Sequence, residues 1–229
     1  MEYLHVSIAF VGGVLPALFW LWFWLREDKK SPEPVGLVIL AFVAGMAVVP
    51  LALPLQKLAL DLYSDVNLVF IWVTIEESLK FAVALSLVLW HKVVDEPIDY
   101  IIYMITIALG FAALENALFM FNPLVAGDLV NSIITGNFRF LGATLLHVLC
   151  SGIVGVFLAF AFYKNNFVKL LAGTFGLFLA ILLHALFNFF IMDASGKTIL
   201  GVFSIVWIGV IILFLLFEKV KILELRHQK

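Results

Sequence analysis

The sequence contains little charge. Of its 229 residues, 13% are charged and 64% are hydrophobic, and the mean hydropathy is +1.14. Soluble domains have about 25% charged and about 45–50% apolar residues, so the composition excludes a mainly soluble protein. The net charge of −2 gives no indication of nucleic-acid binding. The sequence predicts an all-α, polytopic transmembrane helical bundle that forms one integral-membrane domain over residues 1–229.

Three further absences narrow the possibilities. The chain has a single cysteine, Cys150, so it cannot form an internal disulfide. No basic residue precedes the first apolar stretch, whose length of about 22 residues favours a retained helix over a signal peptide. No internal repeat is evident, which argues against a transporter built from duplicated halves.

Seven apolar segments reach the length of about 20 residues that a membrane-spanning helix needs. They are Leu4–Leu25, Val35–Leu55, Asn67–Trp90, Ile98–Phe121, Phe138–Tyr163, Val168–Met192 and Thr198–Phe217. Pro50 and Pro54 predict a kinked or frayed outer end for the second helix. The longest outer connection, Asn122–Asn137, is expected to be a surface lid or a re-entrant piece.

The basic residues predict the orientation of the chain. One set of helix ends carries ten of the fourteen Lys and Arg residues, the opposite set carries three, and Lys80 lies inside the third helix. Because basic residues favour the cytoplasmic side, we expect the N-terminus outside, the C-terminus in the cytoplasm, and a location in the plasma membrane of a prokaryote.

Ionisable residues interrupt the third helix at Glu76, Glu77 and Lys80. A charge near the bilayer centre costs about 2.5–3.5 kcal/mol, and such residues mark functional sites by default. Three other helices carry polar residues at a matching depth, roughly 6–15 Å from the outer edge. These residues are Glu115, His147, His184 and Asn188. We therefore expect the helices to bring acids, bases and potential ligands into one layer.

The local spacing supports a site in this layer. Glu76 and Glu77 are four and three residues before Lys80, so both carboxylates are within its reach, and Lys80 can neutralise one and leave the other to act on water. The alternative is structural. The three charges could form an intramembrane ion-pair network, the histidines could be satisfied core residues, and Glu115-Asn116 could hydrogen-bond a neighbouring helix. Arg139 is expected to be an interfacial anchor that could reach a substrate backbone.

These motifs resemble the PrsW family of intramembrane proteases, in the CAAX protease and bacteriocin-processing superfamily. The resemblance rests on Glu76-Glu77-x-x-Lys80, Phe111-x-x-x-Glu115-Asn116, Arg139, His147-x-x-x-Ser-Gly-Ile-Val-Gly155 and His184-x-x-x-Asn188. It implies an endopeptidase that cuts a single-span membrane protein, such as an anti-sigma factor, on the extracytoplasmic side. The family's last motif ends in Asp where this sequence has Asn188, which is uncharged and a weaker metal ligand.

Two mechanisms fit the residues. In the first, His147 and His184, with Glu115, hold Zn²⁺, and Glu76 or Glu77 is the general base. In the second, one glutamate and His147 activate water without a metal, while His184 and Asn188 donate to the oxyanion. The metal-free version is slightly preferred, because catalytic zinc usually takes three protein ligands and only the two histidines are strong candidates. An ion-coupled transporter and a non-catalytic scaffold remain the alternatives to a protease.

Overall fold

The computed structural model describes residues 2–27, 31–192 and 197–227, and these residues form helices connected by short turns, with no strand among them. The helices are α1 (Glu2–Leu25), α2 (Val35–Leu62), α3 (Asp65–Leu87), α4 (Asp99–Val125), α5 (Leu129–Phe138), the π-helical segment η1 (Arg139–Ala143), α6 (Thr144–Phe160), α7 (Asn166–Met192) and α8 (Lys197–His227). The predicted all-α, polytopic fold is confirmed.

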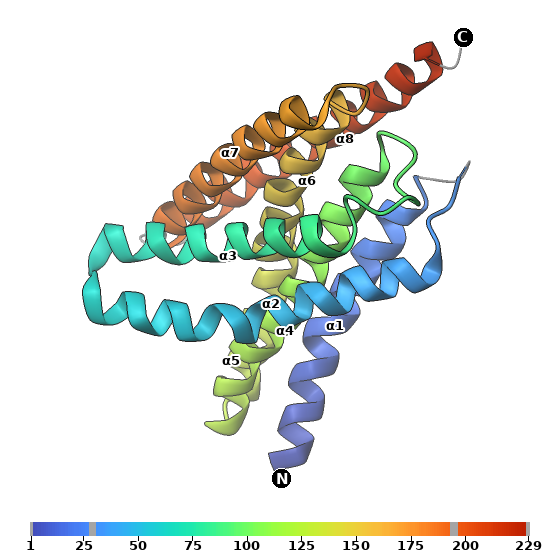
Figure 1. Cartoon of the computed structure of the whole chain (residues 1–229). Coiled ribbons are helices and arrows are strands. Elements are labelled where there is room, and N and C mark those ends of the chain that lie inside the picture. The colour runs from blue at the N-terminus through green and yellow to red at the C-terminus, as the bar shows by residue number, and fades with distance from the viewer. Residues whose placement is uncertain (1, 28–30, 193–196, 228–229) are drawn as a thin grey trace.

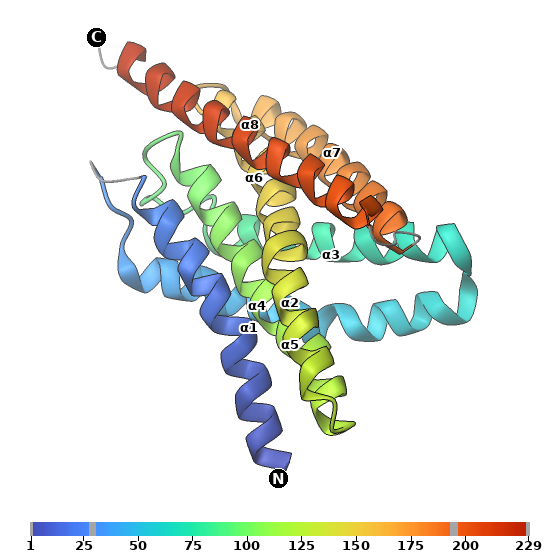
Figure 2. The same cartoon turned by 180° about the vertical axis from the view of Figure 1, so that it is seen from behind.

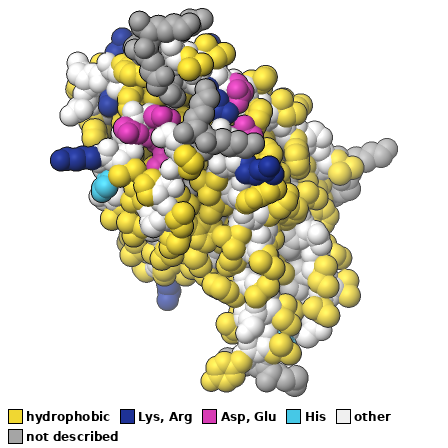
Figure 3. Space-filling view, turned by 90° about the vertical axis from the view of Figure 1, so that its right-hand side faces the viewer, with side chains coloured by type: hydrophobic (Ala, Val, Ile, Leu, Met, Phe, Trp, Pro, Cys, Tyr) yellow, Lys and Arg dark blue, Asp and Glu magenta, His cyan; other side chains and the backbone are white. Residues whose placement is uncertain are grey.

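Six helical stretches within the described residues are long and apolar enough to cross a membrane, counting α5, η1 and α6 as one stretch. The seventh helix of comparable length, α3, has 23 residues but carries Glu76, Glu77 and Lys80 in its interior. Among the described basic residues, Lys57 lies within α2 and Arg139 within the stretch Leu129–Phe160, whereas Lys29, Lys30 and Lys229 lie outside the described residues. Figure 3 shows a largely hydrophobic surface whose charged side chains gather mainly toward one end.

Two predicted helix ends differ from the structure. The second helix continues past Leu55 to Leu62, so the frayed end predicted from Pro50 and Pro54 is not formed. Proline is tolerated inside a membrane helix where neighbouring groups satisfy the freed backbone. The expected connection Asn122–Asn137 is mostly helical, because α4 runs to Val125 and α5 begins at Leu129. The bend between them is short and uses Gly127 at a φ of +80°, a conformation that glycine adopts readily.

Helix α4 is the centre of the bundle and packs against α1, α2 and α6 (Figures 1 and 2). Glycines allow the closest approaches. A Cβ atom on Gly110 would lie 1.9 Å from the carbonyl oxygen of Phe42, and one on Gly155 would lie 2.6 Å from the Cα of Ile101. Small residues of this kind let membrane helices approach backbone to backbone. These contacts fix α2 and α6 on either side of α4.

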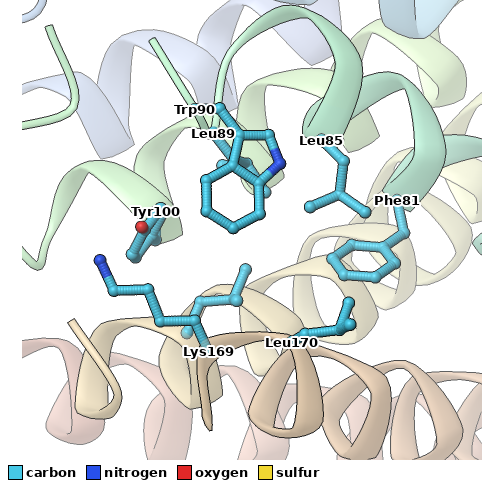
Figure 4. A pocket seen from close by; sticks show the side chains of 8 residues that line it. Phe81, Leu85, Leu89, Trp90, Tyr100, Lys169 and Leu170 are labelled. Atoms are coloured by element: carbon cyan, nitrogen blue, oxygen red, sulfur yellow. The ribbon is translucent and has the colours of Figure 1, made fainter. Parts of the chain in front are cut away.

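The hairpin of α2 and α3 projects beyond the other helices in Figure 1, and α3 also packs against α7. A Cβ on Gly173 of α7 would lie 2.8 Å from the Phe81 ring of α3. Phe81 lines a narrow apolar pocket together with Leu85, Trp90 and Leu170, and Lys169 crosses its edge toward Tyr100 (Figure 4). This packing holds the charged face of α3 against α7.

The close approach of α2 to α4 predicts different outcomes for two glycines of the same helix. A Cβ on Gly45 would lie 2.1 Å from the Ile107 carbonyl oxygen, whereas nothing lies within 4 Å of one on Gly36. Gly45→Ala should lower the free energy of unfolding in detergent by about 1–3 kcal/mol, as overpacking does. The matched control, Gly36→Ala, should cause no loss. Equal stability of the two variants, measured by circular dichroism during thermal unfolding, would contradict this packing.

Candidate active site

The predicted polar layer is assembled in the structure from five segments of the chain. Helix α3 brings the two adjacent glutamates and the lysine, α4 the Glu-Asn pair, η1 the arginine, and α6 and α7 one histidine each. The residues are Glu76, Glu77, Lys80, Glu115, Asn116, Arg139, His147 and His184. Six of them are buried, and Glu115 and Arg139 keep 18% and 16% of their side chains exposed. Hydrogen bonds and ion pairs connect them into one network.

Lys80 and Glu77 form the buried centre of the network. The Lys80 Nζ lies 2.5 Å from Glu77 Oε1 and 3.2 Å from His147 Nδ1, with no exposed surface, and it sits 4.6 Å above the Phe111 ring centroid. An isolated charge is strongly disfavoured in such surroundings, whereas a paired and hydrogen-bonded one is tolerated. Lys80 thus neutralises Glu77, as the sequence spacing predicted.

The neighbours of each histidine define which ring nitrogen carries the proton. An ammonium group only donates hydrogen bonds, so His147 Nδ1 accepts from Lys80 and the proton stays on Nε2, 3.1 Å from Glu115 Oε2. A carboxylate only accepts, so His184 donates from Nδ1 to Glu77 Oε1 at 2.7 Å. The His184 Nε2 is therefore left with its lone pair available. The two imidazole rings meet edge to face, with centroids 4.9 Å apart.

Glu115 and Asn116 are held by Arg139 across the interface between α4 and α6. The Arg139 guanidinium donates to Glu115 Oε2 and, at 2.6 Å, to Asn116 Oδ1, while Asn116 donates to Thr144 Oγ1 at 2.9 Å. Arg139 opens the π-helical turn η1, which rotates its side chain relative to the α-helix that follows. Such π-helical turns occur frequently at functional sites. Arg139 therefore belongs to the described network, whereas the sequence suggested mainly an interfacial anchor.

Glu76 occupies a different environment from its neighbour. Its Oε1 accepts a 2.8 Å hydrogen bond from Gln56, and its Oε2 lies 3.9 Å from His184 Nε2. The backbone of Gln56 is in turn held by Trp72, whose indole N–H donates to the Gln56 backbone carbonyl at 2.9 Å. Sequence reasoning missed Gln56, because the second helix was predicted to end at Leu55. The signal available in the sequence was Gln56 itself, a polar residue one position after the predicted helix end.

The ligand atoms of Glu76, His147 and His184 lie within 4.8 Å of one another, and all three residues are buried. Two imidazoles and one carboxylate with an open fourth position are the donor set of several catalytic zinc sites, so these residues fit such an ion. The third member differs from the sequence prediction, which placed Glu115 in the set. Asn188 is half-buried, and no hydrogen bond joins it to the network within the described residues.

Comparisons with known proteins identify the family of the chain. A model of the PrsW family, described as intramembrane metalloproteases, matches residues 33–217, which include every residue of the network. The chain is 28% identical to Protease PrsW of Oceanobacillus iheyensis over 82% of this chain and 85% of the relative. It is 28% identical to Protease PrsW of Bacillus subtilis over 81% and 83%, and 31% identical to that of Geobacillus kaustophilus over 64% and 63%. No solved structure matches the chain.

The membrane helices and the buried acid–base network, together with these relatives, define an intramembrane protease. It is a multi-pass protein of the prokaryotic plasma membrane. The chain belongs to the PrsW family. The family resemblance seen in the sequence motifs is thereby confirmed.

The buried ion pair predicts a characteristic double-mutant cycle. Lys80→Met leaves the Glu77 carboxylate buried without its cation, and losing one partner of a buried pair costs about 3–5 kcal/mol. Glu77→Gln should be destabilising for the converse reason. The double variant removes both charges, so its loss of stability should be well below the sum of the two single losses. Unfolding in detergent measures all four proteins, and additive losses would contradict the pairing.

Proposed function

We propose that the protein is a zinc-dependent endopeptidase that hydrolyses a peptide bond of a single-span membrane protein near the extracytoplasmic side of the bilayer. The observation that carries this proposal is the convergence of Glu76, His147 and His184 within 4.8 Å at a buried position. An anti-sigma factor, or a protein of similar single-span architecture, is the proposed substrate class. Nucleic acid is not a partner in this proposal.

The accessibility of the site supports a substrate within the lipid bilayer. The residues that the structure describes lie almost entirely in helices joined by short turns, which leaves little polypeptide to bind a soluble protein. The network lies between helices whose outer surfaces are apolar. The proposal requires that a transmembrane substrate segment enter between these helices from the surrounding lipid. Relatives named as proteases favour this function over the transporter and the scaffold.

Glu76, His147 and His184 are the residues that would hold the metal. His147 would bind it through a nitrogen that now hydrogen-bonds to Lys80 or Glu115, so one of these two contacts would be replaced. A bound zinc ion would supply Lewis-acid chemistry, polarising the scissile carbonyl and lowering the pKa of water. Glu77 has a separate role, because its hydrogen bond to Nδ1 fixes the tautomer of His184 and directs Nε2 toward Glu76. A carboxylate behind a metal-binding histidine is a common arrangement and raises the basicity of the ligand.

The carboxylate that accepts the proton of the attacking water follows by elimination. Glu76 is a ligand in this arrangement, and Glu77 Oε1 is occupied by Lys80 and His184, with only 1% of its side chain exposed. Glu115 adjoins His147 and is the most exposed of these three carboxylates, with 18% of its side chain exposed. Glu115 is therefore the proposed acceptor, and Arg139 holds it in place.

A metal-free mechanism would use the same residues differently. Glu76 would then be the general base, because its Oε2 is 3.9 Å from His184 Nε2, a separation that one bridging water can span. The third ligand found in the structure and the description of the family as metalloproteases both favour the zinc mechanism. The metal content of the protein distinguishes the two.

The proposed catalysis predicts that single substitutions abolish cleavage without unfolding the protein. Glu76→Gln and His147→Ala should each reduce cleavage of a single-span reporter by at least about 10²-fold, because each removes a proposed metal ligand and even the loss of an outer-shell partner costs about 10–100-fold. The assay is reconstitution of the purified variants with the reporter in lipid vesicles. Ser204→Ala is the control, because Ser204 is exposed on α8, donates only to the Leu200 carbonyl and should leave most of the activity unchanged. Full activity in both test variants would refute the proposal.

Metal content gives an independent prediction. Elemental analysis of the purified wild type should find about one zinc ion per chain, as a site with three protein ligands and one open position requires. The double variant His147→Ala/His184→Ala should contain none. Active wild-type protein without any metal would overturn the zinc mechanism and leave Glu76 as the base. Protein with neither metal nor activity would favour a scaffold.

A further inference from the structure

A second group of potential ligands lies on the other side of His184. Glu77, Cys150 and His184 offer ligand atoms within 4.8 Å of one another, and all three residues are buried. Cys150 lies on α6 one turn beyond His147, with no exposed surface. Its thiol has no part in the hydrolysis proposed above. A carboxylate, an imidazole and a thiol that converge in the interior form a metal-ligand set of a different chemical type from the first.

We propose that Glu77, Cys150 and His184 form a second metal position that takes a thiophilic divalent ion, such as Cd²⁺ or excess Zn²⁺, and that its occupation inhibits the protease. Thiolate ligands select soft or borderline metals, whereas imidazole and carboxylate also serve harder ones. The cysteine sulfur therefore makes this position more selective for soft metal ions than the first position is. Binding at the position is independent of the proposed function, whereas inhibition rests on it.

Binding of the ion releases one proton and leaves one net positive charge at the second position. The thiol of Cys150 loses its proton to water and binds the ion as a thiolate, and Glu77 contributes a second negative charge, so these two ligands offset the two charges of the ion. The proton that His184 Nδ1 donates to Glu77 across 2.7 Å moves to Nε2, and the ion takes its place. The buried Lys80 ammonium stays beside Glu77 at 2.5 Å and carries the remaining positive charge.

Inhibition follows because His184 belongs to both ligand sets. Its Nδ1 faces Glu77 and its Nε2 faces Glu76. A neutral imidazole that binds a metal through Nδ1 carries its proton on Nε2. The first ligand set then loses the lone pair of His184 and keeps only Glu76 and His147. A metal ion at the second position thus competes with the first position for His184, which the first position needs as a ligand.

The single cysteine makes the binding test specific. Titration of Cd²⁺ into the purified, full-length protein should produce one ultraviolet thiolate-to-metal charge-transfer band, which can arise only from Cys150. The band should be absent in both Cys150→Ser and Cys150→Ala. Glu77→Gln should weaken Cd²⁺ binding by about 10-fold or more, since even an outer-shell partner contributes that much to metal affinity. The control Asn188→Ala should bind as the wild type does.

Cleavage of the reporter supplies the second readout. Cd²⁺ should inhibit the wild type over the same concentration range in which the band develops, and the two Cys150 variants should need at least about 10-fold more Cd²⁺ for equal inhibition. Absence of the band in the wild type would overturn the second metal position. A band accompanied by unchanged cleavage would overturn the inhibition. A band in protein that never cleaves any reporter would instead count against the proposed function and leave the metal position standing.

Discussion

The whole site depends on burying the Lys80 ammonium. It has no exposed surface, so its charge is compensated by buried protein groups and not by water. Glu77 supplies the counter-ion from the same helix, His147 accepts from it on α6, and the Phe111 ring of α4 faces it. A buried cation without these partners would be strongly destabilising. The position of α3 against α4 and α6 is therefore coupled to the ionic state of the active site.

The packing of small residues makes this arrangement possible. Gly110 and Gly155 let α2 and α6 approach α4 to backbone contact, and Gly173 lets α7 close onto Phe81 of α3. Short side chains are needed there because polar atoms on different helices hydrogen-bond only across about 3 Å. Apolar packing and the polar network thus specify the same helix positions. When apolar packing and polar hydrogen bonding favour the same arrangement of helices, that structure is favoured over alternative structures.

The sequence predicted the helices and the depth of the polar layer, because hydrophobic length and residue counting determine both. It could not predict how each helix is rotated about its own axis, which depends on contacts between distant segments. Gln56 was missed because it lies beyond the helix end that the sequence predicted. The π-helical turn at Arg139 was not predicted either. The third potential metal ligand was assigned to Glu115, whereas the structure places Glu76 beside the two histidines. Asn188 has the expected spacing from His184 but does not join the network.

The adjacent glutamates illustrate why rotation matters more than depth. Successive residues of an α-helix are turned by about 100°, so Glu76 and Glu77 share a depth but face different helices. Glu76 meets Gln56 of α2 and the Nε2 side of His184, while Glu77 points inward to Lys80 and the Nδ1 side of the same ring. In the proposed mechanism one carboxylate acts at the reaction centre and the other orients it. Moving the pair by one position along the helix would preserve composition and charge but turn each carboxylate by about 100° away from its partners.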